Sequence, residues 1–129
     1  MSSEVFETGR RIRSTVLGEE RVRKALDEAD AFNREFQQLL TEYCWGACWG
    51  RSALSLKQRS LLNLGMLEAL NRAPEFELHF RGALKNGLTL EELKDALIQI
   101  AIYCGIPAGL EAFKIASKVL DETKQSGSP

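Results

Sequence analysis

Two capping boxes, each followed by apolar residues at helical spacing, constrain the fold of this chain more than any other feature. The first box pairs Ser55 with Gln58, and the second pairs Thr89 with Glu92. In such a box the two side chains satisfy amide groups that the first helical turn leaves unpaired, so each box predicts a helix start. The apolar residues that follow are Leu61, Leu62, Leu64, Leu67 and Leu70 in the first segment, and Leu93, Ala96, Leu97, Ile100 and Ala101 in the second. Both segments are therefore predicted to be amphipathic helices.

Further helices are predicted on either side of these two. A short helix is expected around residues 19–28, and a longer one from Asp30 to about Gly46, with its inward side formed by Phe32, Phe36, Leu39 and Leu40. Pro74 suits a first helical position, and the helix that it opens ends at Gly87. Gly105 and Pro107 interrupt the chain before a last long helix, whose expected inward residues are Leu110, Phe113, Ala116 and Leu120. Because no segment alternates like a strand, we predict an all-α protein of about six helices, with one domain over residues 1–123 and a disordered tail over residues 124–129.

Composition excludes several classes of protein. The chain has 129 residues, of which 44% are hydrophobic and 27% charged, as expected for one globular domain. Its net charge of −1 predicts neither nucleic-acid nor membrane-surface binding. The beginning, "MSSEVFETGRRIRS", lacks the apolar core of a secretory signal, so a cytoplasmic location is expected. An odd number of cysteines, three, favours reduced thiols over a disulfide framework.

The stretch "YCWGACWGRSAL", near the middle of the chain, concentrates aromatic, thiol and cationic side chains. Cys44 and Cys48 are four residues apart, which favours packing, or a redox pair, over the tightly spaced ligands of structural zinc. Trp45 and Trp49 suit a core or a subunit interface. The single histidine, His79, is either a surface residue or a group that exchanges protons near neutral pH. Taken singly, none of these residues indicates a function.

Taken together, they resemble a known family. The segments "GRRIRSTVLGEERV", "FNREFQQLLTEYCWGACWGR", "LKQRSLLNLGMLEAL", "FELHFRGALKNGLTLEEL" and "YCGIPAG" are similar to the γ-carboxymuconolactone decarboxylases of aromatic catabolism. The similarity extends from about Thr8 to Asp121. Its most specific pieces are Trp45-Gly46, Trp49-x-Arg51, Arg59-Ser60-Leu61, Glu77-Leu78-His79, Asn86-Gly87 and Tyr103-x-Gly105-x-Pro107.

The resemblance implies a helical fold of the alkylhydroperoxidase-like superfamily, assembled as a homo-oligomer, specifically a hexamer built as a trimer of dimers. It implies an enzyme without metal or organic cofactor that decarboxylates γ-carboxymuconolactone (4-carboxymuconolactone) or a closely related anionic lactone in aromatic-compound catabolism of the protocatechuate/β-ketoadipate type. The implied catalytic residues are His79, Arg51 and Glu77. The implied substrate-binding residues are Trp45, Trp49, Arg59 and Tyr103.

The chemistry fits these residue types. In this lactone the electrons of the breaking bond flow through the alkene to the lactone carbonyl, so the substrate is its own electron sink and no cofactor is needed. Arg51 is expected to anchor a carboxylate, His79 to act as general acid or as donor to the developing oxyanion, and the aromatic side chains to exclude water. Helical spacing favours Glu75 as the partner of His79. Arg59 and Glu77 form either part of the catalytic machinery or a structural ion pair.

This chain departs from the family pattern at three positions. Ala47 replaces the usual acidic residue, and Ser52-Ala53 replaces a Pro-Gly turn. Peroxidase members of the superfamily carry a Cys-x-x-Cys pair before the histidine, and the corresponding positions here are Arg72 and Glu75. Three alternatives therefore stand beside decarboxylation. They are an isomerase, hydratase or lactone-opening enzyme, a thiol-dependent peroxidase acting through Cys44 and Cys48, and a non-catalytic ligand-binding subunit.

Overall fold

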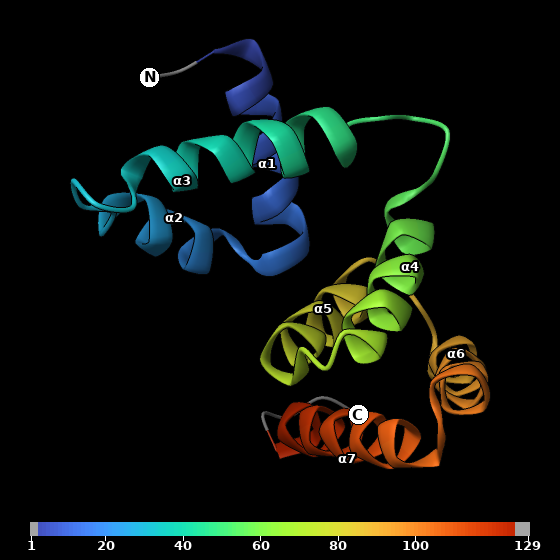
Figure 1. The fold of residues 1–129 in the computed structure, drawn as a ribbon. Coiled ribbons are helices and arrows are strands. Elements are labelled where there is room, and N and C mark those ends of the chain that lie inside the picture. Colours follow the sequence, from blue (N-terminus) through green and yellow to red (C-terminus); the bar gives the residue numbers. More distant parts are fainter. Residues whose placement is uncertain (1–2, 126–129) are drawn as a thin grey trace. The chain divides into compact units, whose positions relative to one another are not determined.

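The computed structural model describes residues 3–125, and it is entirely helical over that range. The helices are α1 (Glu4–Leu17), α2 (Glu19–Asp27), α3 (Arg34–Leu39), the π-helix η1 (Leu40–Cys48), α4 (Leu56–Ala69), α5 (Ala73–Lys85), α6 (Leu90–Cys104) and α7 (Ile106–Gln125) (Figure 1). The all-α prediction is confirmed, with seven α-helices and one π-helix in the described residues against the six or so expected. Within the same range, no helix is long and apolar enough to cross a membrane. Of the predicted disordered tail, residues 124–125 instead belong to α7, and residues 126–129 lie outside the described residues.

The chain divides into two compact units, an N-terminal unit up to Arg59 and a C-terminal unit from Ser60. In the N-terminal unit, α1 crosses the continuous helix formed by α3 and η1 (Figure 1). The sequence analysis did not identify α1, because Gly9 interrupts the apolar face that Val5, Ile12 and Val16 would otherwise form. Ser3 caps α1: its Oγ accepts a hydrogen bond from the Phe6 amide at 3.1 Å.

Two glycines set how closely α1 approaches η1. A Cβ atom on Gly9 would overlap the carbonyl oxygen of Thr41 and would stand 2.8 Å from the backbone nitrogen of Gly46. A Cβ atom on Gly46 would in turn overlap the carbonyl oxygen of Val5. The two backbones are therefore in direct contact, at a separation that no residue other than glycine permits at either position.

The segment predicted as a helix from Asp30 to about Gly46 begins later and has a different form. α3 starts at Arg34, and from Leu40 the chain is a π-helix, in which the amide of Trp49 bonds the carbonyl of Cys44 at 2.9 Å. π-Helices are rare and occur often at functional sites. The predicted inward face is wrong in part: Leu40 packs against the core of this unit, whereas Phe32 is 96% exposed, Phe36 62% and Leu39 56%. Because the helix instead turns its glycine side toward α1, these side chains lie outside the core of the unit.

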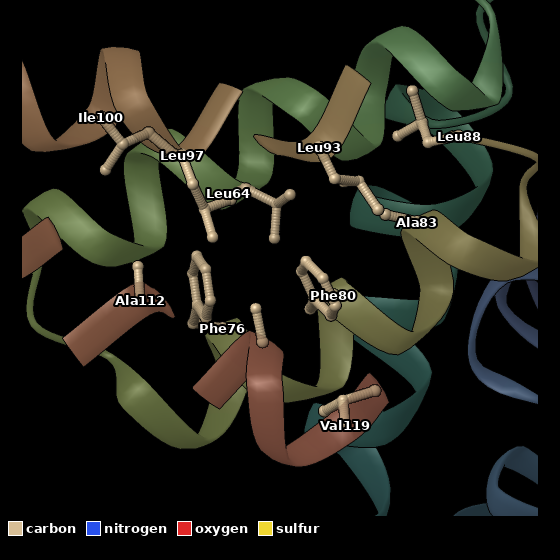
Figure 2. Packing of buried hydrophobic residues seen from close by; sticks show 11 residues of the cluster. Leu64, Phe76, Phe80, Ala83, Leu88, Leu93, Leu97, Ile100, Ala112 and Val119 are labelled. Atoms are coloured by element: carbon tan, nitrogen blue, oxygen red, sulfur yellow. The ribbon is translucent and has the colours of Figure 1, made fainter. Parts of the chain in front are cut away.

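The C-terminal unit has a core of its own, formed by α4, α5, α6 and α7. Phe76 and Phe80 of α5 lie at its centre, with Leu64 and Leu97 directed toward their rings (Figure 2). The rings are nearly parallel, with centroids 6.3 Å apart. The other buried members are Ala83, Leu88, Leu93, Ile100, Ala112, Ala116 and Val119.

Both predicted capping boxes are present. The backbone amide of Gln58 donates to the Ser55 hydroxyl, and the backbone amide of Ser55 donates to the side-chain oxygen of Gln58. Thr89 and Glu92 form the same pair of hydrogen bonds at the start of α6. Gly105, with φ of 108°, separates α6 from α7 as expected. The predicted inward face of α7 is wrong in part: Ala112, Ala116 and Val119 are buried, whereas Leu110 is 69% exposed. On α4, Leu62 and Leu70 are likewise exposed, because only one narrow stripe of that helix meets the core.

Candidate functional site

The predicted aromatic wall lies in the N-terminal unit. Trp45 lies on η1 and Trp49 directly follows it, with the two ring centroids 4.7 Å apart and the ring planes tilted by 32°. Residues four apart lie on the same side of a helix, which brings the two rings together. Each tryptophan is only 5% exposed, and both pack with Val16 in the core of this unit. This placement favours the interpretation as core residues, since little ring surface is open to a ligand within the unit.

Arg51 follows the C-terminal end of η1, Arg59 lies in the first turn of α4, and the two are linked to each other. The Arg59 guanidinium donates through Nη2 to the carbonyl oxygen of Arg51 at 3.2 Å, and its Nη1 lies 4.0 Å from the Cys48 sulfur. The Arg51 side chain is exposed. Neither arginine has an ion-pair partner among the described residues of the N-terminal unit. Two guanidinium groups without a carboxylate partner suit the binding of an anion.

The two neighbouring thiols differ in their surroundings. Cys44, Cys48 and Cys104 are all free, and Cys44 is half-buried while Cys48 is exposed. Burial raises the pKa of the Cys44 thiol, the neighbouring Cys48 raises it further, and Arg13 opposes both effects. A raised pKa lowers the fraction of thiolate, which is the reactive form, so this environment does not favour thiol chemistry at Cys44.

His79 lies in the C-terminal unit, on α5. The side chain is 9% exposed, and its Nδ1 lies 3.4 Å from the Nδ2 of Asn63 on α4. Burial lowers the pKa of the imidazole, and Glu75, one turn earlier on α5, opposes the shift. The expectation that Glu75 is the helical neighbour of His79 therefore agrees with the structure. A buried histidine of lowered pKa is neutral at pH 7 and offers one N–H donor and one acceptor nitrogen.

Glu77 points into an ion-pair network of the same unit. It accepts hydrogen bonds from Arg81 at 2.8 Å and from Lys118 at 3.2 Å, and Arg81 also bonds Glu122. These contacts hold α5 to α7, and the hydrogen bond from Arg81 is the largest cause of the lowered pKa of Glu77. Such a network favours a structural role for Glu77, with Arg81 and Lys118 as its partners in place of the Arg59 that the sequence analysis named.

Tyr103, the remaining predicted site residue, is 84% exposed at the end of α6. The C-terminal unit contains an apolar cavity of about 300 Å³ between α5, α6 and α7, and neither Tyr103 nor His79 lines it. Within residues 3–125, no group of three or more His, Cys, Asp and Glu side chains is arranged to hold a metal ion.

Two of the motif pieces are joined by a hydrogen bond that the sequence could not show. The Asn86 amide donates to the Ser60 hydroxyl at 2.8 Å, and Ser60 is fully buried. Asn86 follows the last residue of α5, and Ser60 lies in the first turns of α4. The bond therefore ties the end of the histidine helix to α4, the helix that carries Asn63.

Glu68 on α4 was missed by the sequence analysis, although a glutamate within a run of leucines is a signal. It is 1% exposed, and neither carboxyl oxygen has an N–H or O–H donor within the described residues. Its neighbour is the carboxyl group of Glu111 on α7, and two carboxyl groups form a hydrogen bond only if one of them is protonated. Burial, followed by this interaction, raises the pKa of Glu68 from 4.5 to about 7.

The variant Glu68→Gln is therefore expected to be more stable than the wild type at alkaline pH. Between about pH 4.5 and 7 the folded chain binds this proton more tightly than the unfolded chain, so stability falls as pH rises through that range. At pH 8 the substitution should raise the free energy of unfolding by about 2 kcal/mol, a value reduced for solvent screening because Glu111 is at the surface. At pH 5 the substitution should change the free energy of unfolding little. Urea unfolding at both pH values checks this. An equal effect at both would contradict the assigned protonation, and Glu111→Gln should produce a smaller gain.

Comparison with known proteins agrees with the motifs. Residues 34–118 match the carboxymuconolactone decarboxylase family. A nitrosuccinic acid decarboxylase of Metarhizium robertsii is 41% identical over 95% of this chain and 86% of its own. A 4-carboxymuconolactone decarboxylase of Acinetobacter baylyi is 34% identical over 91% of this chain and 87% of its own. An uncharacterized 15.0 kDa protein of Paracoccus denitrificans is 29% identical over 64% of this chain and 63% of its own.

The match includes the segments that carry Trp45, Arg51, Arg59 and His79, and two relatives named as decarboxylases align over nearly the whole chain. This chain belongs to the carboxymuconolactone decarboxylase family and is an enzyme of the carboxy-lyase type.

Proposed function

We propose that the enzyme decarboxylates a small dicarboxylic acid in which the bond to the departing carboxylate is placed so that its electrons can flow into an electron-accepting group. The observation that carries this proposal is the combination of family membership with two arginines that lack carboxylate partners and a buried histidine of lowered pKa. Arg51, whose backbone carbonyl accepts a hydrogen bond from Arg59, binds the carboxylate that remains in the product. His79 stabilises the charge that develops on the electron-accepting group.

The reaction balances without a redox partner. The carbon–carbon bond breaks, CO2 leaves, and the electron pair moves onto an oxygen of the accepting group, after which a proton adds to carbon. In 4-carboxymuconolactone the acceptor is the lactone carbonyl, reached through the alkene. In nitrosuccinic acid the acceptor is the nitro group on the same carbon, which becomes a nitronate. Both molecules retain a second carboxylate for the arginines.

Of these two substrates, nitrosuccinic acid is the first choice. The relative named for it is 41% identical to this chain, against 34% for the relative named for 4-carboxymuconolactone. The changes at Ala47 and Ser52-Ala53 depart from the motif typical of the lactone enzymes, which counts against the lactone as first choice. 4-Carboxymuconolactone, or a closely related anionic lactone of aromatic catabolism, is the second candidate, supported by the six motif pieces.

The test is to follow CO2 release from each acid by purified protein, together with 3-nitropropanoic acid or enol-lactone formation. Turnover of one acid at least a hundredfold above the uncatalysed rate supports the proposal and names the substrate. If neither is decarboxylated, the proposal is wrong, and product analysis separates the alternatives. Consumption of the lactone without CO2 indicates an isomerase, hydratase or ring-opening enzyme. Thermal stabilisation without turnover indicates a ligand-binding subunit, and consumption of peroxide blocked by alkylation indicates chemistry at Cys48 or Cys44.

Replacing Arg51 by methionine should raise KM about ten- to a hundredfold with a smaller change in kcat. The substitution keeps a long side chain but removes the charge-assisted hydrogen bonds to the retained carboxylate, worth about 1.5–3 kcal/mol. Arg21→Met, which removes an exposed arginine of α2 in the same unit, is the matched control and should leave KM unchanged. Steady-state kinetics of both variants check the prediction. An unchanged KM for Arg51→Met would remove this residue from substrate binding.

We also propose that the chain assembles as a homohexamer, a trimer of dimers, in the cytoplasm. Both units leave large apolar side chains exposed, including Phe32 and Tyr43 in the first and Ile102 and Leu110 in the second. Such faces mark interaction surfaces. Light scattering during gel filtration measures the mass directly, and a mass of one 14.4 kDa chain would overturn the assembly.

A further inference from the structure

We propose that Asn63 is a positioning residue for His79, whose side-chain amide holds the neutral imidazole in the tautomer that carries its proton on Nε2. The catalytic meaning of this inference rests on the proposed function, but the tautomer itself is a property of the free protein.

The geometry that carries the proposal lies entirely within the C-terminal unit. Asn63 on α4 and His79 on α5 face each other, with Nδ2 of the amide 3.4 Å from Nδ1 of the ring. The imidazole is 9% exposed and the asparagine is half-buried, so water competes little for this contact. At the far end of α5, the hydrogen bond from Asn86 to Ser60 joins the same two helices and fixes their spacing.

Asn63 also breaks the local pattern of its own helix. It stands in the middle of α4, within the run "LLNLGML", where asparagine is a poor helix former and the neighbouring positions are apolar. A residue that violates local preference in this way is expected where a site, rather than the fold, selects it. The contact with His79, the chain's single histidine, explains why asparagine is selected at this position.

The direction of the hydrogen bond determines the tautomer. An amide nitrogen only donates, so the Nδ1 that faces it is the acceptor, and the proton of the neutral ring is on Nε2. Burial favours the neutral ring, and Glu75 is the charged group that opposes it. Asn63 is uncharged and therefore orients the ring without stabilising the imidazolium, as a carboxylate at this position would.

The consequence is a choice between the two roles that the sequence left open for His79. A neutral ring with its proton on Nε2 is a hydrogen-bond donor to a developing oxyanion, but it is a very weak acid and does not transfer that proton to carbon. His79 is then the oxyanion donor, and the proton that completes the product comes from another source.

Because the chain has one histidine, long-range ¹H–¹⁵N NMR of uniformly ¹⁵N-labelled protein reads this tautomer without assignment work. Above the pKa of the ring, the wild type should show an unprotonated Nδ1 and a protonated Nε2. Asn63→Leu should shift the ring toward a mixture of tautomers and lower kcat about three- to tenfold, with KM little changed. Asn63→Asp should accept a bond from Nδ1, move the proton there, raise the pKa of the ring and lower kcat about a hundredfold.

Glu75→Gln is the matched control. It removes the charge that opposes the effect of burial, so it should lower the pKa of His79 and leave the tautomer as in the wild type. A proton on Nδ1 in the wild type overturns the proposal. So does a tautomer ratio that stays the same in Asn63→Leu, provided the circular dichroism of that variant matches the wild type. The NMR result needs no substrate, so absence of turnover overturns the proposed function and not the assignment of the tautomer.

Discussion

Replacing Gly9 by alanine is expected to destabilise the N-terminal unit by about 3 kcal/mol. The new methyl group would overlap the carbonyl oxygen of Thr41, which is backbone and cannot move aside as a flexible side chain would. α1 would have to separate from η1, and the core that contains Val16, Trp45 and Trp49 would open with it. The chain has two tryptophans, both in this unit, so their fluorescence during urea unfolding reports the unit selectively.

The same substitution at Gly65 is the control. Gly65 is also helical, on α4, but a Cβ atom there meets only Ile100, at 4.0 Å. Gly65→Ala should therefore stabilise the C-terminal unit by about 0.5–1 kcal/mol, because alanine loses less backbone entropy in a helix. Gly46→Ala should resemble Gly9→Ala, since its methyl group meets the Val5 carbonyl. Equal effects at Gly9 and Gly65 would show that α1 and η1 are not held in backbone contact.

Replacing His79 by alanine is expected to lower kcat about a hundred- to a thousandfold, the usual cost of removing one donor from an oxyanion site. Glutamine should lower it only about tenfold. The amide nitrogen of glutamine reaches a position similar to Nε2 of histidine and donates a hydrogen bond there, but it carries no exchangeable acid function. Both variants are compared with the wild type on the acid that the decarboxylation assay identifies.

The pair of variants separates the two roles of His79. If the imidazole delivers the proton to carbon, glutamine is no better than alanine, and both lose activity to the same extent. If both retain nearly full kcat, the histidine takes no part in the chemistry and is a core residue of α5. Because the side chain is buried, circular dichroism and the unfolding midpoint of each variant are measured first, so that a folding defect is not counted as lost catalysis.

Much of this protein was determined by local sequence. The capping residues Ser55 and Thr89, and the break at Gly105, predicted where helices begin and end, because unpaired amides and backbone dihedrals depend on neighbouring residues alone. The family motifs, which are strings of neighbouring residues, identified the enzyme class in the same way. They also singled out Arg51 and His79.

Tertiary structure decided which side of each helix is buried. Phe32 and Phe36 were expected inward and are exposed, because η1 meets α1 through Gly9 and Gly46, residues that carry no apolar signal. Tertiary structure also decided which residues lie next to the titratable groups. Asn63 reaches His79 from another helix, and Glu68 acquires its raised pKa only where α4 meets α7. Periodicity in the sequence identifies an apolar stripe on a helix. The close approach of two backbones and the burial of a polar group depend instead on how segments distant in sequence pack together, so only the folded unit could reveal these features.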